Sequence, residues 1–299
     1  MYAVAASTAI ALKNILVATD LSPASLWSLP YVVGIAHQYG STIYLATVVP
    51  LAIYGVARPE SFDAIEAECR DYAQEKLDRF SAGIRAQGIA VQVLLTEGDV
   101  AQVIPDWVEQ HKIDLLAVGT TGRGGLHKLF LGSTAEELIR EVSCPVLTVG
   151  PTLSGESPAR LRSILFATDF SAESFRAGRY ACSIACRYNA RLILMHVTDE
   201  HATQVSRRSL IRRLHDLIPE NLNLPNEPEE LLAQGRPAGK ILEVANQHSV
   251  DLIAIGVRGA GGLARAASHF GSTAHEVIVG ATCPVLVVRA PDSHRTPVK

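Results

Sequence analysis

The segment NILVATDLS, residues 14–22, returns as SILFATDFS at residues 163–171, with six of nine positions identical. Each copy is a short apolar run that ends in a polar turn, which is typical of a strand buried in a parallel sheet. In the first copy Ser22 and Pro23 follow, a pair that favours a helix start, and Gly40 suits the end of that helix after Tyr39. The segment therefore predicts a strand–turn–helix unit that occurs twice.

Two further blocks repeat in the same order. Residues 110–126 return at 247–263 with ten of 17 positions identical, and residues 132–149 return at 271–288 with 11 of 18 identical. The spacing between the blocks shows that the second copy has lost 12 residues in its middle and gained two in its glycine-rich loop. We expect a first domain at 1–150, a linker rich in Gly, Pro and Ser at 151–162, and a second domain at 163–299.

Strands and helices alternate within each copy. In the first, apolar runs at 42–49, 91–95, 114–119 and 145–149 predict strands, and apolar residues at helical spacing across 60–87 predict a helix. This alternation predicts an α/β fold with two tandem Rossmann-like domains, each a five-stranded parallel sheet with helices on both faces.

The composition excludes several classes of protein. The chain has 299 residues, 48% of them hydrophobic, which is enough apolar surface for real cores. A net charge of −3 gives no basic excess for nucleic acid or an anionic membrane. No apolar run approaches the roughly 20 residues of a membrane-spanning helix. Five cysteines without a paired framework indicate reduced thiols and a cytoplasmic location.

The glycine pattern near the fourth predicted strand favours a phosphate site. Gly119, Gly122 and Gly132 follow that strand at intervals of three and ten residues, and Ser133 then opens a helix. Glycine lets the backbone approach a ligand closely, and a helix N-terminus presents free amides and partial positive charge. Any one of these glycines could be a simple turn residue. Asp20, at the first strand end, is expected to meet a base or ribose, with a turn or capping role as the alternative.

These features resemble the universal stress protein family. The resemblance is carried by the strand-end Asp, the segment DLLAVGTTGRGG, the glycine spacing before Ser133, and CPVL, which occurs twice. It covers nearly the whole chain as two tandem copies. It implies ATP-binding domains whose occupancy tunes a stress or signalling role. It also implies an internal pseudo-dimer of the two repeats through their last strands, with a homodimer as a further option.

The resemblance also implies which residues surround the nucleotide. In the first copy these are Ala18, Thr19, Asp20, Val48, Val118, Gly119, Gly122, Gly132, Ser133 and Thr134. In the second copy they are Ala167, Thr168, Asp169, Val197, Ile255, Gly256, Gly259, Gly271, Ser272 and Thr273. The longer loop before Gly271 puts the ATP geometry of the second copy in doubt. Thr47 stands where the family usually has His, with little expected effect because backbone meets the base.

Several catalytic motifs are absent from the sequence. It has no Walker A motif, no Gly-x-Gly-x-x-Gly after the first strand and no Gly-x-Ser-x-Gly elbow. No general base or arginine finger is visible, so we expect no catalytic residue, no metal ligands of the protein's own, and little or no hydrolysis of ATP, which could carry Mg²⁺ or Mn²⁺. The alternatives are a slow ATPase or nucleotidyl-hydrolysing enzyme of the adenine-nucleotide α-hydrolase-like fold, and a nucleotide-free interaction scaffold. The arginine run at 207–213 is interpreted as a solvated helix face.

Overall fold

The computed structural model describes residues 10–50, 62–120, 131–150, 161–198, 204–219, 222, 224–257 and 272–289. Contacts group the chain into two compact units. We call Leu12–Ser157 the first unit, and Pro158–Lys299 together with Met1–Ala11 the second unit. The residues just before Leu12 belong with the second unit, where the Ile10 backbone N–H donates to Ser183 Oγ at 3.0 Å.

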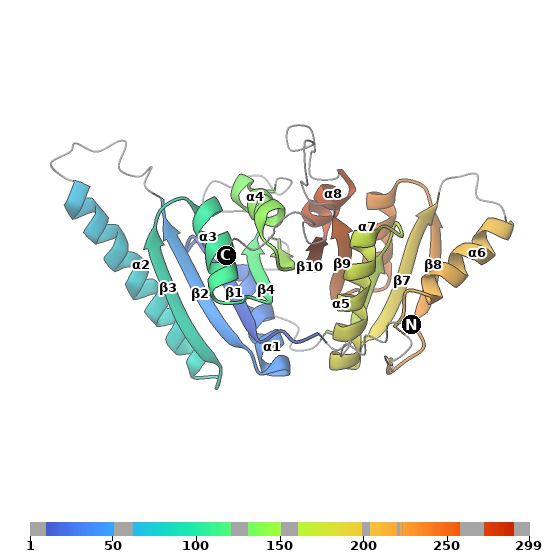
Figure 1. Ribbon diagram of the computed structural model, residues 1–299, viewed down its shortest axis with the longest axis horizontal. Helices are drawn as coiled ribbons and strands as arrows, with labels where there is room; N and C mark the ends of the chain where they lie inside the picture. The colour runs from blue at the N-terminus through green and yellow to red at the C-terminus, as the bar shows by residue number, and fades with distance from the viewer. Residues whose placement is uncertain are drawn as a thin grey trace, which may run out of the picture. The chain divides into compact units, whose positions relative to one another are not determined.

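The first unit contains five parallel strands in the order β3-β2-β1-β4-β5. Figure 1 labels β1 to β4 of this sheet. They are β1 (Asn14–Ala18), β2 (Thr42–Val49), β3 (Ala90–Glu97), β4 (Leu115–Gly119) and β5 (Val146–Val149). The central strand is buried on both faces, because Ile15, Leu16 and Val17 are all 0% exposed. This confirms the buried parallel strand that the opening segment predicts.

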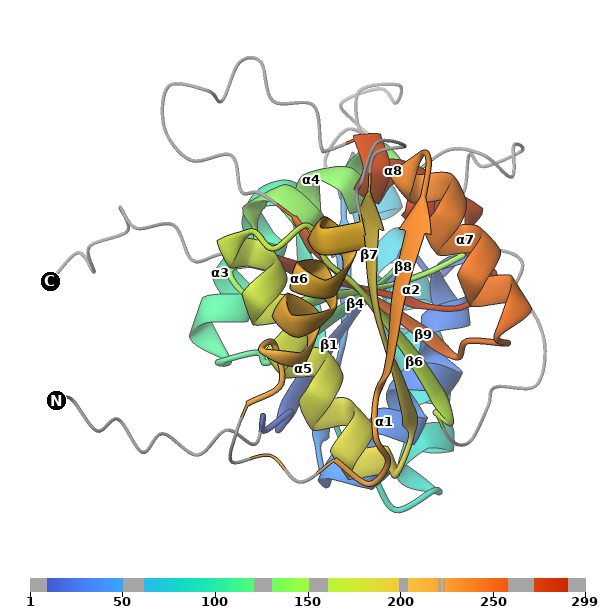
Figure 2. The ribbon, with the colours of Figure 1, turned by 90° about the vertical axis from the view of Figure 1, so that its right-hand side faces the viewer.

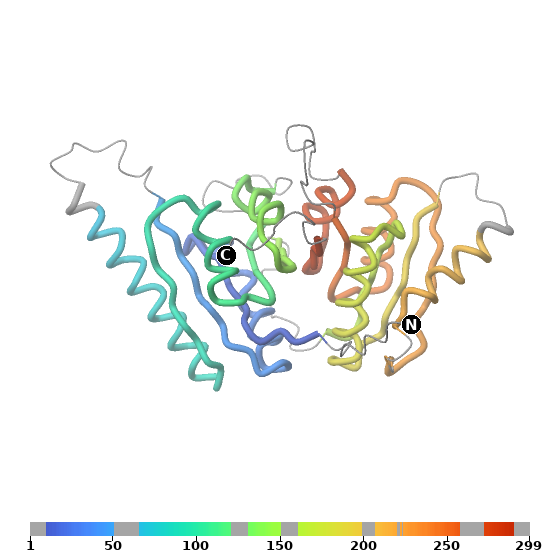
Figure 3. The backbone as a smooth tube through the Cα atoms, viewed as in Figure 1, coloured from blue at the N-terminus to red at the C-terminus, as the bar shows by residue number. Residues whose placement is uncertain are grey.

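Helices cover both faces of this sheet. The first unit has the 3₁₀ turn η1 (Ser25–Ser28), α1 (Leu29–Tyr39), α2 (Phe62–Arg85), α3 (Val100–Gln110) and α4 (Ser133–Glu141). Helix α2 packs on β2 and β3, while α3 packs on α4, as the path of the backbone in Figure 3 shows. The right-handed crossovers expected of a Rossmann-like layout explain this arrangement.

The first helix begins later than its sequence predicts. A regular helix does not start at Ser22; instead a tight turn leads into η1 at Ser25, where the Ser25 N–H donates to Ser22 Oγ at 3.2 Å. The end of the helix agrees with its prediction, since Gly40 has a left-handed φ of 63° and its N–H donates to the Ala36 carbonyl. Glycine adopts this conformation without steric cost.

The second unit repeats this architecture, with strand order β10-β9-β6-β7-β8. Its strands are β6 (Ser163–Ala167), β7 (Arg191–Thr198), β8 (Glu229–Gln234), β9 (Leu252–Val257) and β10 (Val285–Arg289). Its helices are α5 (Ala172–Tyr188), α6 (Gln204–His215), α7 (Pro237–Gln247) and α8 (Ser272–Gly280). Figure 2 shows α5 and α6 on one side of β7 and β8, with α7 on the other.

The deletion in the second copy falls on one helix. Helix α6 has 12 residues, whereas its counterpart α2 has 24. The shorter helix still packs on β7 and β8, so the sheet keeps its five strands. Length is therefore lost from a covering helix rather than from the strands that hold the candidate site.

At the amino end of each sheet, an aspartate at the equivalent position bonds to the start of the first strand. Asp114 Oδ2 accepts from the backbone N–H groups of Lys13 and Asn14 at 2.7 and 2.9 Å. Asp251 Oδ2 does the same for Arg162 and Ser163, at 2.7 and 3.0 Å. Each Asp precedes its β4 or β9 strand, so these bonds align that strand with the first strand of the copy.

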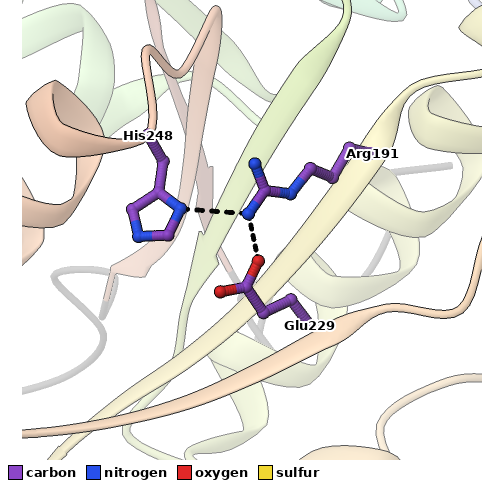
Figure 4. Close-up of polar contacts among 3 residues, drawn as sticks. All are labelled: Arg191, Glu229 and His248. Atoms are coloured by element: carbon purple, nitrogen blue, oxygen red, sulfur yellow. Dashed lines mark hydrogen bonds and ion pairs between the residues drawn. The ribbon is translucent and has the colours of Figure 1, made fainter.

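The second sheet has an additional polar cluster at this end. Arg191 forms an ion pair with Glu229 and donates a hydrogen bond to His248 Nδ1 at 3.0 Å (Figure 4). The three residues come from the starts of β7 and β8 and from the end of α7, so the cluster ties that helix to two strands. Exposed ion pairs of this kind contribute little to stability, up to about 1 kcal/mol.

The five cysteines are free thiols. Burial raises the pKa of Cys144, Cys182 and Cys283 to about 12, so these thiols are protonated and poorly reactive at neutral pH. Among the described residues, no three His, Cys, Asp or Glu side chains gather in a group that could hold a metal ion. A search of the same residues finds no helix that could serve as a membrane span.

Candidate functional site

The candidate site lies at the carboxyl edge of each sheet, where the predicted residues of neighbouring strands meet. Ala18 is in register with Ala46 of β2 and with Val118 of β4. In the second unit Ala167 is in register with Met195 of β7 and with Ile255 of β9. Beyond these positions lie Val48 and Val197. The first strand is therefore flanked on both sides by candidate residues, which is where ligands bind in open α/β sheets.

Asp20 closes a tight turn directly after β1. Its Oδ1 accepts from the Ser22 N–H at 3.0 Å and from the Ser22 hydroxyl at 2.6 Å. Between them Leu21 has a left-handed φ of 65°. Asp20 thus has the turn role that the sequence analysis named as the alternative. If Asp20 also contacts a ligand, it does so in addition to holding this turn.

Thr19 is committed to the same turn. Its hydroxyl accepts from the Leu21 N–H at 2.9 Å and pairs with the Ser25 hydroxyl at 2.6 Å. Its side chain is also buried, with 6% of the residue exposed. The hydroxyl of Thr19 therefore serves the turn, and its backbone N–H donates to the Ala46 carbonyl at 2.9 Å.

The second copy builds the same turn from equivalent residues, but its second serine, Ser174, bonds to the aspartate rather than to the threonine. Asp169 Oδ1 accepts from the Ser171 N–H at 2.9 Å and from the Ser174 hydroxyl at 2.5 Å. Phe170 has a φ of 60°, and its N–H donates to Thr168 Oγ1 at 2.9 Å. Partial burial alone would raise the pKa of Asp169, but the hydrogen bonds from Ser171 and Ser174 outweigh it and hold this pKa below the ordinary value.

Thr47 and His196 make the same hydrogen bond in the two copies. Thr47 Oγ1 donates to the Thr19 carbonyl at 3.0 Å, and His196 Nδ1 lies 2.7 Å from the Thr168 carbonyl. Because a carbonyl only accepts, His196 carries its proton on Nδ1. The residue that departs from the family pattern therefore preserves the contact that its histidine counterpart makes.

Gly119 and Gly256 allow a helix to pack closely on the strand end. A Cβ added to Gly119 would stand 2.8 Å from the Ala24 carbonyl oxygen, and one added to Gly256 would stand 2.5 Å from Ser174 N. Neither residue has a left-handed φ. We expected these glycines to admit a ligand, and the structure gives each of them a packing role as well.

Gly132 begins α4 without a side-chain cap. Its φ and ψ of −62° and 142° are open to any residue, so the freedom expected of a glycine is not used here. Its N–H donates to the Thr120 carbonyl at 2.8 Å, while Ser133 and Thr134 are exposed at the first turn. Free amides at an uncapped helix start suit an anion. Ser272 and Thr273 are the first two residues of α8.

Part of the predicted site lies outside the described residues. Gly122, Gly259 and Gly271 fall there, as do His127 and most of both glycine-rich loops. The structure thus describes the predicted residues at the ends of the first, second and fourth strands of each copy, and the first turns of α4 and α8.

Sequence reasoning missed Ser25 and Ser174. Each hydroxyl supports the turn after the first strand, Ser25 through Thr19 and Ser174 through Asp169. A signal was available, because each serine stands five residues after the strand-end aspartate in both copies. Taken with the strand order, these contacts define a tandem Rossmann-like protein with a candidate ligand site at each carboxyl edge.

Comparison with known proteins identifies the family. The family model described as the universal stress protein family matches residues 11–150 and again 160–289. The chain therefore belongs to the universal stress protein family, with two tandem domains.

Individual relatives agree with this assignment. A universal stress protein of Methanocaldococcus jannaschii is 32% identical over 138 residues, which cover 46% of this chain and 81% of that protein. A universal stress protein of Mycolicibacterium smegmatis is 27% identical over 295 residues, covering 92% and 97% of the two chains. The crystal structure of a universal stress protein from Archaeoglobus fulgidus aligns with a TM-score of 0.75 at 25% identity, covering 94% of this chain and 99% of that one.

Proposed function

We propose that the first unit binds an adenine nucleotide, with ATP as the first candidate, and that occupancy tunes a stress or signalling role. The observation that carries the proposal is a continuous series of contacts along the carboxyl edge. Thr19 pairs with Ser25, whose backbone packs against Gly119, and the following Thr120 accepts from Gly132 at the start of α4. The turn beside the base is thus connected to the helix start that would meet phosphate.

The two ends of this edge differ in chemistry in the way a nucleotide requires. Val48 is an apolar residue at the end of β2, still 8% exposed, and suits a base. The first turn of α4 offers backbone amides and the exposed hydroxyls of Ser133 and Thr134, which suit phosphate oxygens. One acidic residue, Glu136, lies in that turn and is within 3.9 Å of Arg140, which offsets its charge.

We propose that hydrolysis is slow or absent. Phosphoryl transfer needs a positioned water and charge stabilisation on the departing phosphate. Asp20 already holds the turn at the adenosine end through its Oδ1. The loop residues that could act near the phosphates, His127, Arg123 and Lys128, lie outside the described residues. A slow ATPase is the alternative, and the assay in the Discussion separates the two.

Thermal unfolding of the full chain with and without ATP tests the proposal. A ligand at 100 times its dissociation constant stabilises the folded state by about 2.7 kcal/mol, so the melting temperature should rise with ATP and Mg²⁺. GTP at the same concentration serves as the matched control for base recognition. An unchanged melting temperature in ATP would favour the interaction scaffold over the nucleotide-binding protein.

The pairing of the two repeats stays a prediction. It rests on the apolar last strands, whose buried residues run through β5 and β10. If each half, expressed alone, is monomeric and as stable as the whole chain, that prediction is wrong.

A further inference from the structure

The second unit holds a cluster of three side chains, Arg213, Phe170 and His196, beside its candidate site. Arg213 of α6 places its Cζ 4.0 Å from the centre of the Phe170 ring. The ring of His196, from β7, lies 4.5 Å from the same centre at an angle of 45°. Phe170 directly follows Asp169, and His196 directly precedes Val197. The cluster is therefore attached to the proposed base and ribose half of the site.

The cation–π contact with Phe170 leaves Arg213 able to bind an anion. A guanidinium over an aromatic ring uses its face, so its N–H donors remain available in its own plane. Because the ring holds the cation in place, less side-chain entropy is lost when a ligand binds. Arg213 is exposed, and no carboxylate of the described residues forms an ion pair with it.

The rest of α6 adds to the positive charge. The helix contains Arg207, Arg208, Arg212 and Arg213 and has no acidic residue. Within the described part of the chain, the first three of these arginines form no ion pair, and His215 is the residue of α6 that pairs with a carboxylate, Glu230. A helix that only faced water would be more stable with acidic and basic residues side by side. Helix α6 carries basic residues without acidic ones, which gives it a positive surface potential.

The strand order places this charge opposite the predicted phosphate end. In the order β10-β9-β6-β7-β8, β9 flanks β6 on one side and β7 flanks it on the other. Helix α8, whose first turn is the candidate phosphate contact, follows β9, while α6 packs on β7 and β8. A ligand lying across β6 would thus meet positive groups at both ends.

The first unit lacks this arrangement. Leu21 stands in place of Phe170, and Thr47 stands in place of His196. Helix α2, the counterpart of α6, contains six acidic and four basic residues. The two sites therefore differ in the charge that they offer on the ribose side.

We propose that the second unit binds an adenine nucleotide that carries an additional phosphate on its ribose, and that Arg213 contacts this phosphate. The proposal rests on the proposed function, since it assumes an adenosine moiety at the family site. It assigns the arginine run a binding role in place of the solvated helix face expected from the sequence.

Two ligands with equal numbers of phosphates test this proposal. Adenosine 3′,5′-bisphosphate and ADP share base, ribose and phosphate count, and differ in where the second phosphate is attached. Calorimetric titration of the full chain should show one site that binds the bisphosphate at least tenfold more tightly than ADP. Arg213→Ala should weaken binding of the bisphosphate by about tenfold and leave the affinities for ADP and ATP unchanged.

Two further variants make the test specific. Arg213→Gln keeps a long polar side chain without the charge and should behave as Arg213→Ala does. Arg79→Ala removes a positive charge from α2 of the first unit and should change the affinity for neither the bisphosphate nor ADP. Melting temperatures would confirm that all variants are folded.

The outcomes separate the two proposals. If ATP or ADP binds but the bisphosphate shows no preference, or keeps its preference in Arg213→Ala, this inference is wrong and the proposed function stands. If no adenine nucleotide binds the full chain, both are wrong.

Discussion

Gly256 lies directly against Ser174, so that a Cβ on the glycine would stand 2.5 Å from the serine backbone nitrogen. Gly119 has the same relationship to Ser25 in the first unit, with 2.9 Å to its Cα. In both cases the close atoms are backbone, which cannot rotate away as a side chain could. The strand-end glycine is therefore required for the turn of Asp20 or Asp169 to pack on the sheet.

Alanine at either glycine should destabilise the unit that contains it. We expect Gly119→Ala and Gly256→Ala each to lower the free energy of unfolding by about 1–3 kcal/mol, as overpacking does. Gly132→Ala is the matched control, because its φ is −62° and the nearest atom to its added Cβ is the Thr120 carbonyl oxygen at 3.5 Å. Urea denaturation followed by circular dichroism measures all three. Equal stability of Gly119→Ala and the wild type would contradict the packing role.

The hydroxyl of Thr47 should matter more than the absence of the family histidine. Thr47 is 4% exposed and donates to the Thr19 carbonyl at 3.0 Å. Thr47→Val keeps the shape but leaves that carbonyl without this donor, at an expected cost of about 1 kcal/mol. Thr47→Ser retains the hydroxyl, so loss of this hydrogen bond should not lower its free energy of unfolding as it does in Thr47→Val. Chemical denaturation of the two variants provides the measurement, and a Val variant as stable as the wild type would speak against the hydrogen bond.

The turn of the second unit should lose stability in acid. The pKa of Asp169 is lower in the folded state, because the hydrogen bonds from Ser171 and Ser174 outweigh the effect of burial. The resulting stabilisation is fully present above the unfolded pKa of about 3.9 and is lost as pH falls through the lower folded pKa. Asp169→Asn should therefore be less stable than the wild type at pH 6, and the difference should shrink below about pH 4. A difference that does not change with pH would contradict the assigned role of the carboxylate.

Turnover of ATP should be far slower than that of an ordinary enzyme. A steady-state phosphate-release assay on the full chain should stay well below the enzyme median of about 10 s⁻¹. Sustained turnover near that rate, lost in His127→Ala while ATP still binds, would replace the binding-protein interpretation with an ATPase. Binding of ATP should be measured on the same variant, so that loss of the nucleotide is not mistaken for loss of catalysis.

The sequence predicted strands better than turns. The run at 42–49 coincides with β2, because alternation of buried apolar strands with helices leaves a clear local pattern. The helix predicted from Ser22 begins instead as a tight turn and η1, because the hydroxyls of Thr19 and Ser25 pair across it. Hydroxyl pairing depends on side-chain direction, which spacing alone does not give.

The glycines show a second limit of sequence reasoning. Gly119 was assigned to a ligand because glycine admits a close approach, but the closest neighbour that the structure shows is the backbone of Ala24 and Ser25. These residues are nearly 100 positions away along the chain, and only the fold brings them together. Likewise, the Arg213–Phe170–His196 cluster joins a helix, a turn and a strand that no local motif connects.

Calorimetric titration of the full chain with ATP tests the central proposal most directly. The wild type should bind ATP with at least one site per chain. Gly132→Val should lose that site, because under the proposal phosphate meets the start of α4 and a valine side chain there would crowd it. Gly83→Val makes the same change on α2, where an added Cβ has no neighbour within 4 Å, and should bind as the wild type does. Unchanged ATP affinity in a folded Gly132→Val protein would contradict the account.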